Sequence, residues 1–229
     1  MKRQVVLDTE TTGLEVSQGH RIIEIGCVEL INRRLTGRHF HQYIQPERDI
    51  DAGALAVHGI TPEFLADKPT FDRIVKDFLG FIEDAELVIH NAPFDVGFID
   101  AEFMRLDRNH PNTASLCSVV DTLTLARSKH PGQRNSLDAL CNRLGVDNSS
   151  RDQHGALLDA ELLAEVYLHL SGGQASLVLN ASTSDAAKPQ HKLAPKNKQL
   201  RVIMPSDKEL ADHSAFLSDL HETADQGCL

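Results

Sequence analysis

The sequence predicts an α/β domain with a mixed five-stranded sheet flanked by helices, followed by a flexible C-terminal tail. Three apolar-polar alternating runs occur within the first 44 residues, a pattern typical of strands joined in a meander. Short apolar runs then alternate with segments of helical spacing, as in α/β domains. Beyond Gly172-Gly173 large apolar residues become sparse. The 229 residues, 41% of them hydrophobic, suffice for one good core rather than two full domains.

The first three strands are predicted from apolar runs and the turns between them. Val5–Leu7 is a β-branched-rich run that leads to the turn signal Thr12-Gly13. A second run covers residues 21–30 and a third covers residues 40–44. We expect the polar, glycine-containing residues 32–37 to form the turn between the second and third strands.

The remaining elements alternate between helix and strand. Residues 52–84 are mostly helical in pattern, with a helix start at Thr61-Pro62-Glu63. Short strands are predicted at residues 87–90 and 119–121. The other helices are predicted to begin at Pro93, after the capping residue Ser136, and at Ala156, the last one running to Leu170.

The C-terminal region divides into a linker and a terminal element. Residues 180–199 are rich in Ala, Ser, Lys, Pro and Asn, which is typical of a flexible linker. Ser206 and Glu209 form a capping-box signature ahead of an apolar helical stripe. We therefore expect a domain over 1–172, a linker over 173–199 and a terminal element over 200–229. So small an element cannot build its own core, so it is expected to dock on another protein.

Charge and cysteine usage limit the class of protein. The net charge is -10, and most of the acidity lies within residues 1–172. Such a domain would bind free DNA weakly unless metal ions neutralise its site or a partner holds the DNA. The four cysteines show no Cys-x-x-Cys spacing, which indicates reduced thiols in a cytoplasmic protein without a zinc site. No apolar run suits a membrane span or a signal peptide, so no membrane association is expected.

Asp8 and Glu10 are the first candidate site. Because side chains alternate along a strand, both carboxylates point to the same face. Two such groups at a buried strand end repel each other and are costly to desolvate, and a divalent cation would remove that cost. A simple acidic pair at a solvated strand end is the ordinary alternative.

Three more residues are candidates at two other places in the chain. Asp95 stands in the first turn of the helix that Pro93 begins, where a carboxylate also complements the helix dipole. His154 fits a loop before the last helix, with Asp159 inside that helix and partly facing the sheet. A lone loop histidine is more often an ordinary surface residue.

Together these segments resemble the three motifs of the DEDDh exonucleases. The motifs are Asp8–Gly13, His90–Asp95 and the pair His154 and Asp159, in the expected order between residue 4 and about residue 170. Val57–Thr61 and Arg134–Cys141 add to the resemblance. Within this group the chain is similar to the epsilon proofreading subunits of bacterial DNA polymerase III, because a linker and a terminal element follow the domain.

The resemblance implies a ribonuclease-H-like core and two catalytic Mg²⁺ or Mn²⁺ ions. It assigns the ions to four carboxylates, Asp8, Glu10, Asp95 and Asp159. His154, whose ordinary pKa of about 6.5 leaves it largely neutral, would then be a general base rather than a ligand. Contacts with the terminal nucleotide are expected from Asp8, Glu10, Thr11 and Asp159. His58, His90 and Phe94 are further candidates to line this pocket, although each suits simple packing equally well.

The implied partners are the 3′ ends of DNA, single-stranded or frayed, and other replication proteins. The polymerase alpha subunit would bind the terminal element through Leu210, Phe216, Leu217 and Leu220. Gln174, Leu177 and Leu179 resemble a short motif that docks into the sliding clamp, because an extended segment places both leucines on one side. The alternative is that this segment packs on the domain. A small theta-like subunit is a further candidate partner.

Two other functions are weighed against proofreading. One is a DEDDh exoribonuclease of the ribonuclease T or oligoribonuclease type, which would not need the tethered tail. The other is a mainly structural adaptor between polymerase and clamp, in which the active site is incidental. The complete set of five catalytic residues disfavours the adaptor.

Overall fold

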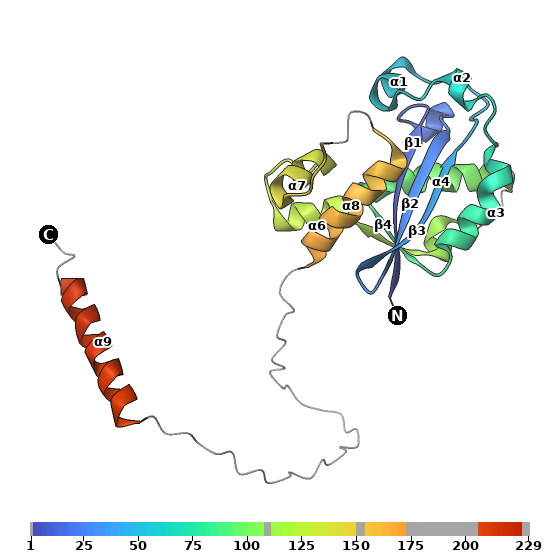
Figure 1. Cartoon of the computed structure of the whole chain (residues 1–229). Coiled ribbons are helices and arrows are strands. Elements are labelled where there is room, and N and C mark those ends of the chain that lie inside the picture. The colour runs from blue at the N-terminus through green and yellow to red at the C-terminus, as the bar shows by residue number, and fades with distance from the viewer. Residues whose placement is uncertain (1, 108–110, 150–153, 173–205, 226–229) are drawn as a thin grey trace, which may run out of the picture. The chain divides into compact units, whose positions relative to one another are not determined.

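A five-stranded mixed sheet forms the centre of the protein. The computed structural model describes residues 2–107, 111–149, 154–172 and 206–225. The strand order is β3-β2-β1-β4-β5, and Figure 1 shows the sheet with helices around it. The strands are β1 (Arg3–Thr11), β2 (Ile22–Ile31), β3 (Arg34–Tyr43), β4 (Glu86–Ile89) and β5 (Ser118–Asp121). The pairs β1–β2 and β2–β3 are antiparallel, whereas β4 and β5 continue parallel to β1, so the predicted mixed sheet is confirmed.

The turn between β2 and β3 is shorter than the sequence predicted. We expected a turn over residues 32–37, but β3 already begins at Arg34. The hairpin turns on Asn32 and Arg33, whose φ angles of 49° and 65° match the left-handed turns that suit tight hairpins. The prediction was wrong because the side chains of residues 34–39 on this edge strand are polar or exposed and therefore resemble a loop.

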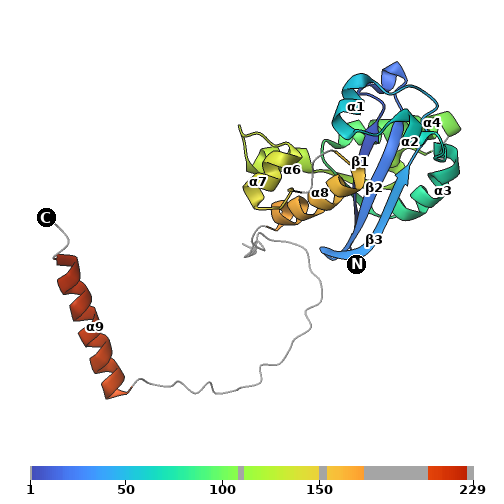
Figure 2. The same ribbon diagram turned by 45° about the horizontal axis from the view of Figure 1, so that its top comes forward.

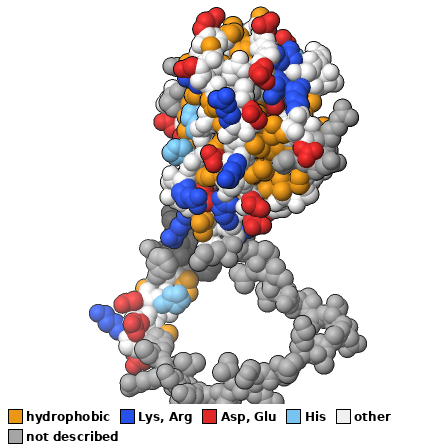
Figure 3. Space-filling model, turned by 90° about the vertical axis from the view of Figure 1, so that its right-hand side faces the viewer, with side chains coloured by type: hydrophobic (Ala, Val, Ile, Leu, Met, Phe, Trp, Pro, Cys, Tyr) orange, Lys and Arg blue, Asp and Glu red, His pale blue; other side chains and the backbone are white. Residues whose placement is uncertain are grey.

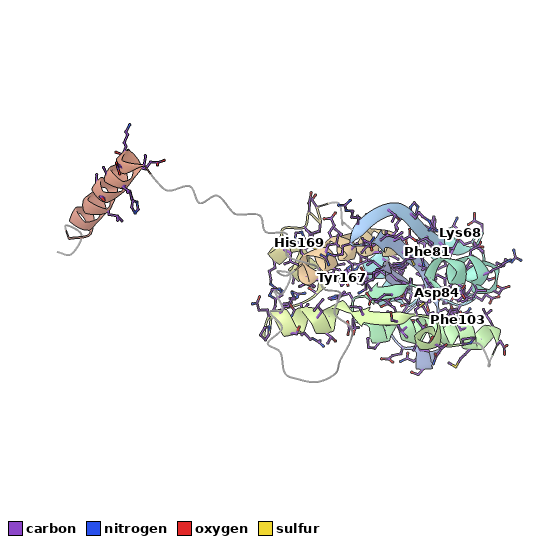
Figure 4. The ribbon with its side chains drawn as sticks, turned by 90° about the horizontal axis from the view of Figure 1, so that it is seen from below. Lys68, Phe81, Asp84, Phe103, Tyr167 and His169 are labelled. Carbon is purple, nitrogen blue, oxygen red and sulfur yellow. The ribbon has the colours of Figure 1, made fainter. Side chains whose placement is uncertain are left out.

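Helices cover both faces of the sheet. On one face, α3 (Phe71–Ile82) and α4 (Ala92–Leu106) pack on the odd-numbered apolar residues of β1, including Val5 and Leu7. On the other face, α8 (Ala156–Ser171) packs on Val6 and on the neighbouring strands. Figure 4 shows Phe81 and Phe103 of the first core well separated from Tyr167 of the second.

Shorter helices complete the domain around these layers. A third apolar cluster joins α6 (Thr122–Lys129) and α7 (Leu137–Leu144) to α8, and Figure 2 shows the three helices together on one side of the sheet. The short helix η1 (Val16–Gln18) lies between β1 and β2, and α1 (Ala52–His58) and α2 (Pro62–Leu65) lie between β3 and α3 in the sequence. Helix α5 (Thr113–Leu116) precedes β5. Helices α5 and α6 were not predicted. The predicted helix starts at Thr61 and Ser136 are confirmed, since both side chains accept a hydrogen bond from a backbone N–H in the first turn.

The terminal element is a unit by itself. Residues 1–178 and 179–229 form two separate units, and the second contains α9 (Asp207–Asp225). The predicted capping box is confirmed: the Ser206 N–H donates to Glu209 Oε2 at 2.7 Å, and the Glu209 N–H donates to Ser206 Oγ at 3.3 Å. The expected linker and the segment Gln174–Leu179 lie outside the described residues. None of the described helices combines the length and apolar character that a membrane span requires.

The start of α8 lies directly against the backbone of β2. A Cβ atom placed on Gly26 would lie 2.2 Å from the carbonyl carbon of Ala156, the first residue of α8. Gly26 pairs with Asp8 on the neighbouring strand. The absence of a side chain at Gly26 therefore sets how closely α8 approaches the end of β1 that carries the acidic residues.

We expect Gly26→Ala to destabilise the domain by about 1–3 kcal/mol or more, because the added methyl group meets immobile backbone. Gly80→Ala is the matched control, since Gly80 lies in α3 and a methyl group added there would have nothing within 4 Å of it. That change should leave stability equal or raise it by up to about 1 kcal/mol. Thermal unfolding of both variants is the measurement, and equal melting temperatures would contradict the close approach of α8.

Candidate active site

A cleft of about 510 Å³ opens at the carboxyl ends of β1 and β4. This edge is where α/β sheets commonly bind ligands. The cleft gathers all five residues predicted to be catalytic, which lie far apart in the sequence. Its lining residues are Asp8, Thr9, Glu10, His90, Phe94, Asp95, Leu123, Arg127, Gln133, Asn135, Ser136, Leu137, Asp138, His154 and Asp159.

Strand β1 distributes its last residues between the two faces of the sheet. Asp8 and Glu10 follow the even-numbered register of Val6 and point to the α8 face. Thr9 follows Val5 and Leu7 to the opposite face, where its hydroxyl donates to Asp95 Oδ1 at 2.6 Å. The strand thus supplies two carboxylates to one face and orients a third from the other face.

Asp95 is held at the start of α4 by the turn that follows β4. Asn91 adopts a left-handed conformation with φ 64°, and its N–H donates to Asp121 Oδ1 at 3.1 Å. Asp95 is 3% exposed, and burial raises the pKa of its carboxyl to about 7, with the hydrogen bond from Thr9 acting in the opposite direction. Its ionised form therefore needs a nearby positive charge at neutral pH.

His154 and Asp159 come from the loop before α8 and from its first turn. His154 Nδ1 lies 3.2 Å from Asp159 Oδ2, with His154 44% exposed and Asp159 almost fully buried. The His154 N–H donates to the Val57 carbonyl oxygen at 3.4 Å, which ties the loop to α1. The loop position predicted for His154 and the helical position predicted for Asp159 are both observed.

Part of this cluster has the spacing of a metal site. One potential ligand atom from each of Glu10, His154 and Asp159 lies within 4.8 Å of the other two. His154, predicted to be a base and not a ligand, is thus close enough for either role. Carboxylate oxygens are the ligands that hard divalent cations prefer, so the four acids form a donor set that could hold such ions.

A second, largely apolar pocket of about 380 Å³ adjoins the cleft. Thr9, Glu10 and Phe94 line both. Thr11 and His58, for which the sequence predicts contacts with the terminal nucleotide, line this pocket. His90 lies instead in the cleft, with Nδ1 2.9 Å from Thr122 Oγ1. Leu14, 78% exposed, and Val57 belong to the same pocket.

His58 has an unusual hydrogen-bonding state. It is 4% exposed, and its Nδ1 accepts a hydrogen bond from the Ile60 N–H at 2.9 Å. Burial lowers the pKa of His58, which favours the neutral ring, so Nε2 carries the proton. Among the described residues Nε2 finds no hydrogen-bond partner although it is buried. A ligand acceptor in the pocket would satisfy this donor.

Several lining residues were not found by sequence reasoning. Thr9 lies between two candidate acids, and strand alternation could have assigned it to the face of Asp95. Asn135 lies in the segment Arg134–Cys141 that adds to the resemblance, but it was given no role. Leu14 and Arg127 gave no signal, because a turn and a helix distant in sequence bring them to the site. On the face seen in Figure 3, basic and acidic side chains of the first unit are intermingled.

Comparison with known proteins decides the family. A family model described as Exonuclease matches residues 5–167. The DNA polymerase III subunit epsilon of Pasteurella multocida is 51% identical over 241 residues, which cover 99% of this chain and 92% of that protein. The same subunit of Escherichia coli K12 is 50% identical and covers 99% and 96%. The chain belongs to the family of DNA polymerase III epsilon subunits. This epsilon-family protein is therefore a 3′–5′ exonuclease of the proofreading type.

Solved structures agree with this assignment. Exonuclease X in complex with 5′ overhanging duplex DNA is 26% identical with a TM-score of 0.56, covering 73% of this chain and 90% of that chain. The nuclease domain of 3′hExo, a DEDDh family member bound to rAMP, has a TM-score of 0.63 at 21% identity and covers 74% and 92%. The predicted ribonuclease-H-like fold is thus confirmed for the epsilon-family exonuclease. The match of its relatives over 99% of the chain disfavours the exoribonuclease alternative.

The pKa of Asp95 leads to a prediction about pH and metal ions. Because this pKa lies near 7 in the folded protein against an ordinary 3.8, the folded state binds a proton that the unfolded chain has lost. The contribution of Asp95 to stability therefore falls as pH rises from about 4 through 7. In chelator, the melting temperature of the native protein should fall relative to that of Asp95→Asn between pH 6 and pH 8.

Adding Mg²⁺ should reverse this loss, because a cation binds the ionised carboxylate. The rise in melting temperature should be larger at pH 8 than at pH 6, and small at both for Asp95→Asn. A constant difference between the two proteins across this range would show that Asp95 does not titrate as described.

Proposed function

We propose that the cleft hydrolyses the terminal phosphodiester of a DNA 3′ end, with Asp8, Glu10, Asp95 and Asp159 as metal ligands and His154 as general base. The convergence of these four acids and one histidine in a single cleft is the observation that carries the proposal. Membership of the exonuclease family and the position of these five residues in one cleft support the proposal.

The acids suit two divalent cations of the Mg²⁺ or Mn²⁺ type. Four carboxylates provide only oxygen donors, and the buried Asp95 carboxyl requires a positive charge in order to ionise at neutral pH. When bound, two such ions activate the attacking water and stabilise the leaving oxygen. Asp95 and Asp159 each lie in the first turn of a helix, where the helix dipole also favours negative charge.

His154 would accept a proton from the attacking water. A neutral imidazole that donates its Nδ1–H to Asp159 carries the lone pair on Nε2. The ring is 44% exposed, so it can reach solvent in the cleft. Its loop is anchored at the backbone by Val57, which limits its range of positions.

The apolar pocket is placed to hold the terminal nucleotide. Phe94 lines both pockets and can contact the base, and the buried Nε2–H of His58 can donate to an oxygen of the sugar or phosphate. Thr11, whose hydroxyl donates to the Gly13 carbonyl at 2.7 Å, shapes the wall beside Glu10. Such a pocket accepts any base, so mismatched ends would be selected because they fray more easily.

Mutation of Asp8 and Glu10 tests the proposed role of the acids as metal ligands. Asp8→Ala combined with Glu10→Ala should lower turnover on a mismatched primer by roughly 1,000-fold or more, because the ions supply several kcal/mol of transition-state stabilisation. The fold should persist, since the pair is mutually repulsive without metal. Native protein should lose activity in chelator and regain it with Mg²⁺ or Mn²⁺.

Asp77→Ala combined with Glu83→Ala is the matched control, because it removes two exposed acids from α3 and its end, outside the cleft lining. This control should keep native turnover. Near-native turnover in the Asp8 and Glu10 double variant would sink the metal-ligand assignment.

The terminal element is proposed to bind the polymerase alpha subunit in the bacterial cytoplasm, at the replisome. Leu210 and Leu217 lie seven residues apart on α9, so they share one face, and they are 51% and 47% exposed. The side chains of Phe216 and Leu220 lie outside the described residues, and their role remains part of the proposal. Gln174, Leu177 and Leu179 are proposed to engage the sliding clamp, whose weak contact would be strengthened by tethering.

The tail is tested by Leu210→Ala combined with Leu217→Ala. This protein should fail to co-purify with the polymerase subunit yet keep native exonuclease activity, because the proposed catalytic residues all belong to the first unit. Leu35→Ala removes a comparably exposed leucine, 50% exposed on β3, and should change neither property. Gln174→Ala with Leu177→Ala should weaken clamp binding alone. Undiminished polymerase binding would place the main contact on the first unit.

A further inference from the structure

Glu24 is a buried carboxylate directly beside the metal-ligand candidates. It is 2% exposed on β2 and pairs across the sheet with Glu10, so both side chains lie on the α8 face. Its Oε1 lies 2.7 Å from His41 Nε2, and its Oε2 accepts a hydrogen bond from the Ala156 N–H at 3.1 Å. Among the described residues, no Lys or Arg forms an ion pair with Glu24.

The Ala156 N–H is one of the groups that a helix leaves without an internal partner at its start. The preceding residue, Gly155, has no side chain that could cap it. Glu24 therefore supplies from another strand what an N-cap side chain normally supplies, with a negative charge at the positive end of α8. His154 stands two residues before this anchored amide, and Asp159 three residues after it.

The surroundings leave the start of α8 little freedom. The backbone of Gly26 on β2 limits how closely α8 approaches the sheet. The His154 N–H donates a hydrogen bond to the Val57 carbonyl oxygen at 3.4 Å. Glu24 is a further anchor, because its Oε2 accepts a hydrogen bond from the first amide of the helix. A buried carboxylate so close to Glu10 is electrostatically unfavourable, so core packing alone is a poor explanation for it.

We propose that Glu24 is a positioning residue, which holds the first amide of α8 so that the adjoining His154 faces Glu10. This inference rests on the proposed role of His154 as general base. The effect requires the reach of the side chain to the Ala156 amide more than it requires the charge. Misplacement of a catalytic group by about 1 Å can cost about 100-fold in rate.

Two substitutions separate reach from charge. Glu24→Asp keeps the charge but removes one methylene, so its oxygen cannot reach the Ala156 N–H without a shift of the helix. Glu24→Gln keeps the reach, because its amide oxygen can accept from Ala156 while its NH₂ donates to a neutral His41. Glu29→Asp is the matched control, since Glu29 is 1% exposed on the same strand and is ion-paired with Arg3 and Arg38 instead.

Each variant is measured alone and together with His154→Ala, on a single-stranded DNA end at saturating Mg²⁺. Glu24→Asp should lower kcat by about 10- to 100-fold with KM changed less than about twofold. Glu24→Gln should stay within about threefold of native kcat, and Glu29→Asp within about twofold even if it lowers the melting temperature equally. In the His154→Ala background, the further loss from Glu24→Asp should shrink to less than about twofold, because coupled residues are not additive.

The outcomes distinguish the inference from the function on which it rests. A slow His154→Ala together with a native kcat for Glu24→Asp would overturn the positioning role and leave the general base in place. A loss of kcat in Glu24→Asp equal to the loss in Glu29→Asp would also overturn the positioning role. So would a loss of kcat from Glu24→Asp that is equally large in the His154→Ala background. A fully active His154→Ala would overturn the general base and the positioning role together.

Discussion

Repulsion among carboxylates confined at one sheet edge is the constraint on which the rest of the structure depends. Four acids converge in one cleft, and one of them, Asp95, is buried so far that its pKa rises to about 7. Two features of the fold reduce this cost. Asp95 and Asp159 each occupy the first turn of a helix, and the Thr9 hydroxyl donates to Asp95. The remaining cost is what divalent cations would relieve, so stability and activity are linked to metal in the same cleft.

The alternation of β1 makes this arrangement possible within a few residues. Val5 and Leu7 build the core under α3 and α4, while Val6 builds the core under α8. The same alternation continues past the apolar run, so that Asp8 and Glu10 meet α8 and Thr9 meets α4. The same strand therefore contributes to both hydrophobic cores and meets both helices that carry the other acids. These are α4 with Asp95 and α8 with Asp159. A slip of one residue in the register of β1 would turn Asp8 and Glu10 toward α4 and Thr9 toward α8.

Local signals in the sequence were enough for most elements and for the four acids that meet in the cleft. Pro93 and the capping residues Thr61 and Ser136 identified helix starts, because capping depends on neighbouring residues alone. The start of β3 was missed because an exposed edge strand carries polar side chains. Helix α6 was missed because most of its residues are not buried. Its buried residues are Thr122 and Ala126.

The parts of the site that could not be predicted depend on pairing between distant segments. Glu24 looks like an ordinary polar position in an alternating strand, and only the register with Glu10 and the contact with Ala156 reveal its place. Arg127 reaches the cleft through the packing of α6 on α8. His58 Nε2, which has no hydrogen-bond partner within the described part of the chain, likewise follows from burial and from the Ile60 amide, which no motif encodes.

The central claim is that four carboxylates hold two metal ions while His154 remains a base. Crystals of the protein soaked in Mn²⁺ and measured by anomalous diffraction test it most directly. We predict two anomalous peaks about 4 Å apart in the cleft, ligated by Asp8, Glu10, Asp95 and Asp159, with no bond to His154. A single ion bound by Glu10, His154 and Asp159, the three residues whose ligand atoms lie within 4.8 Å of one another, would contradict it.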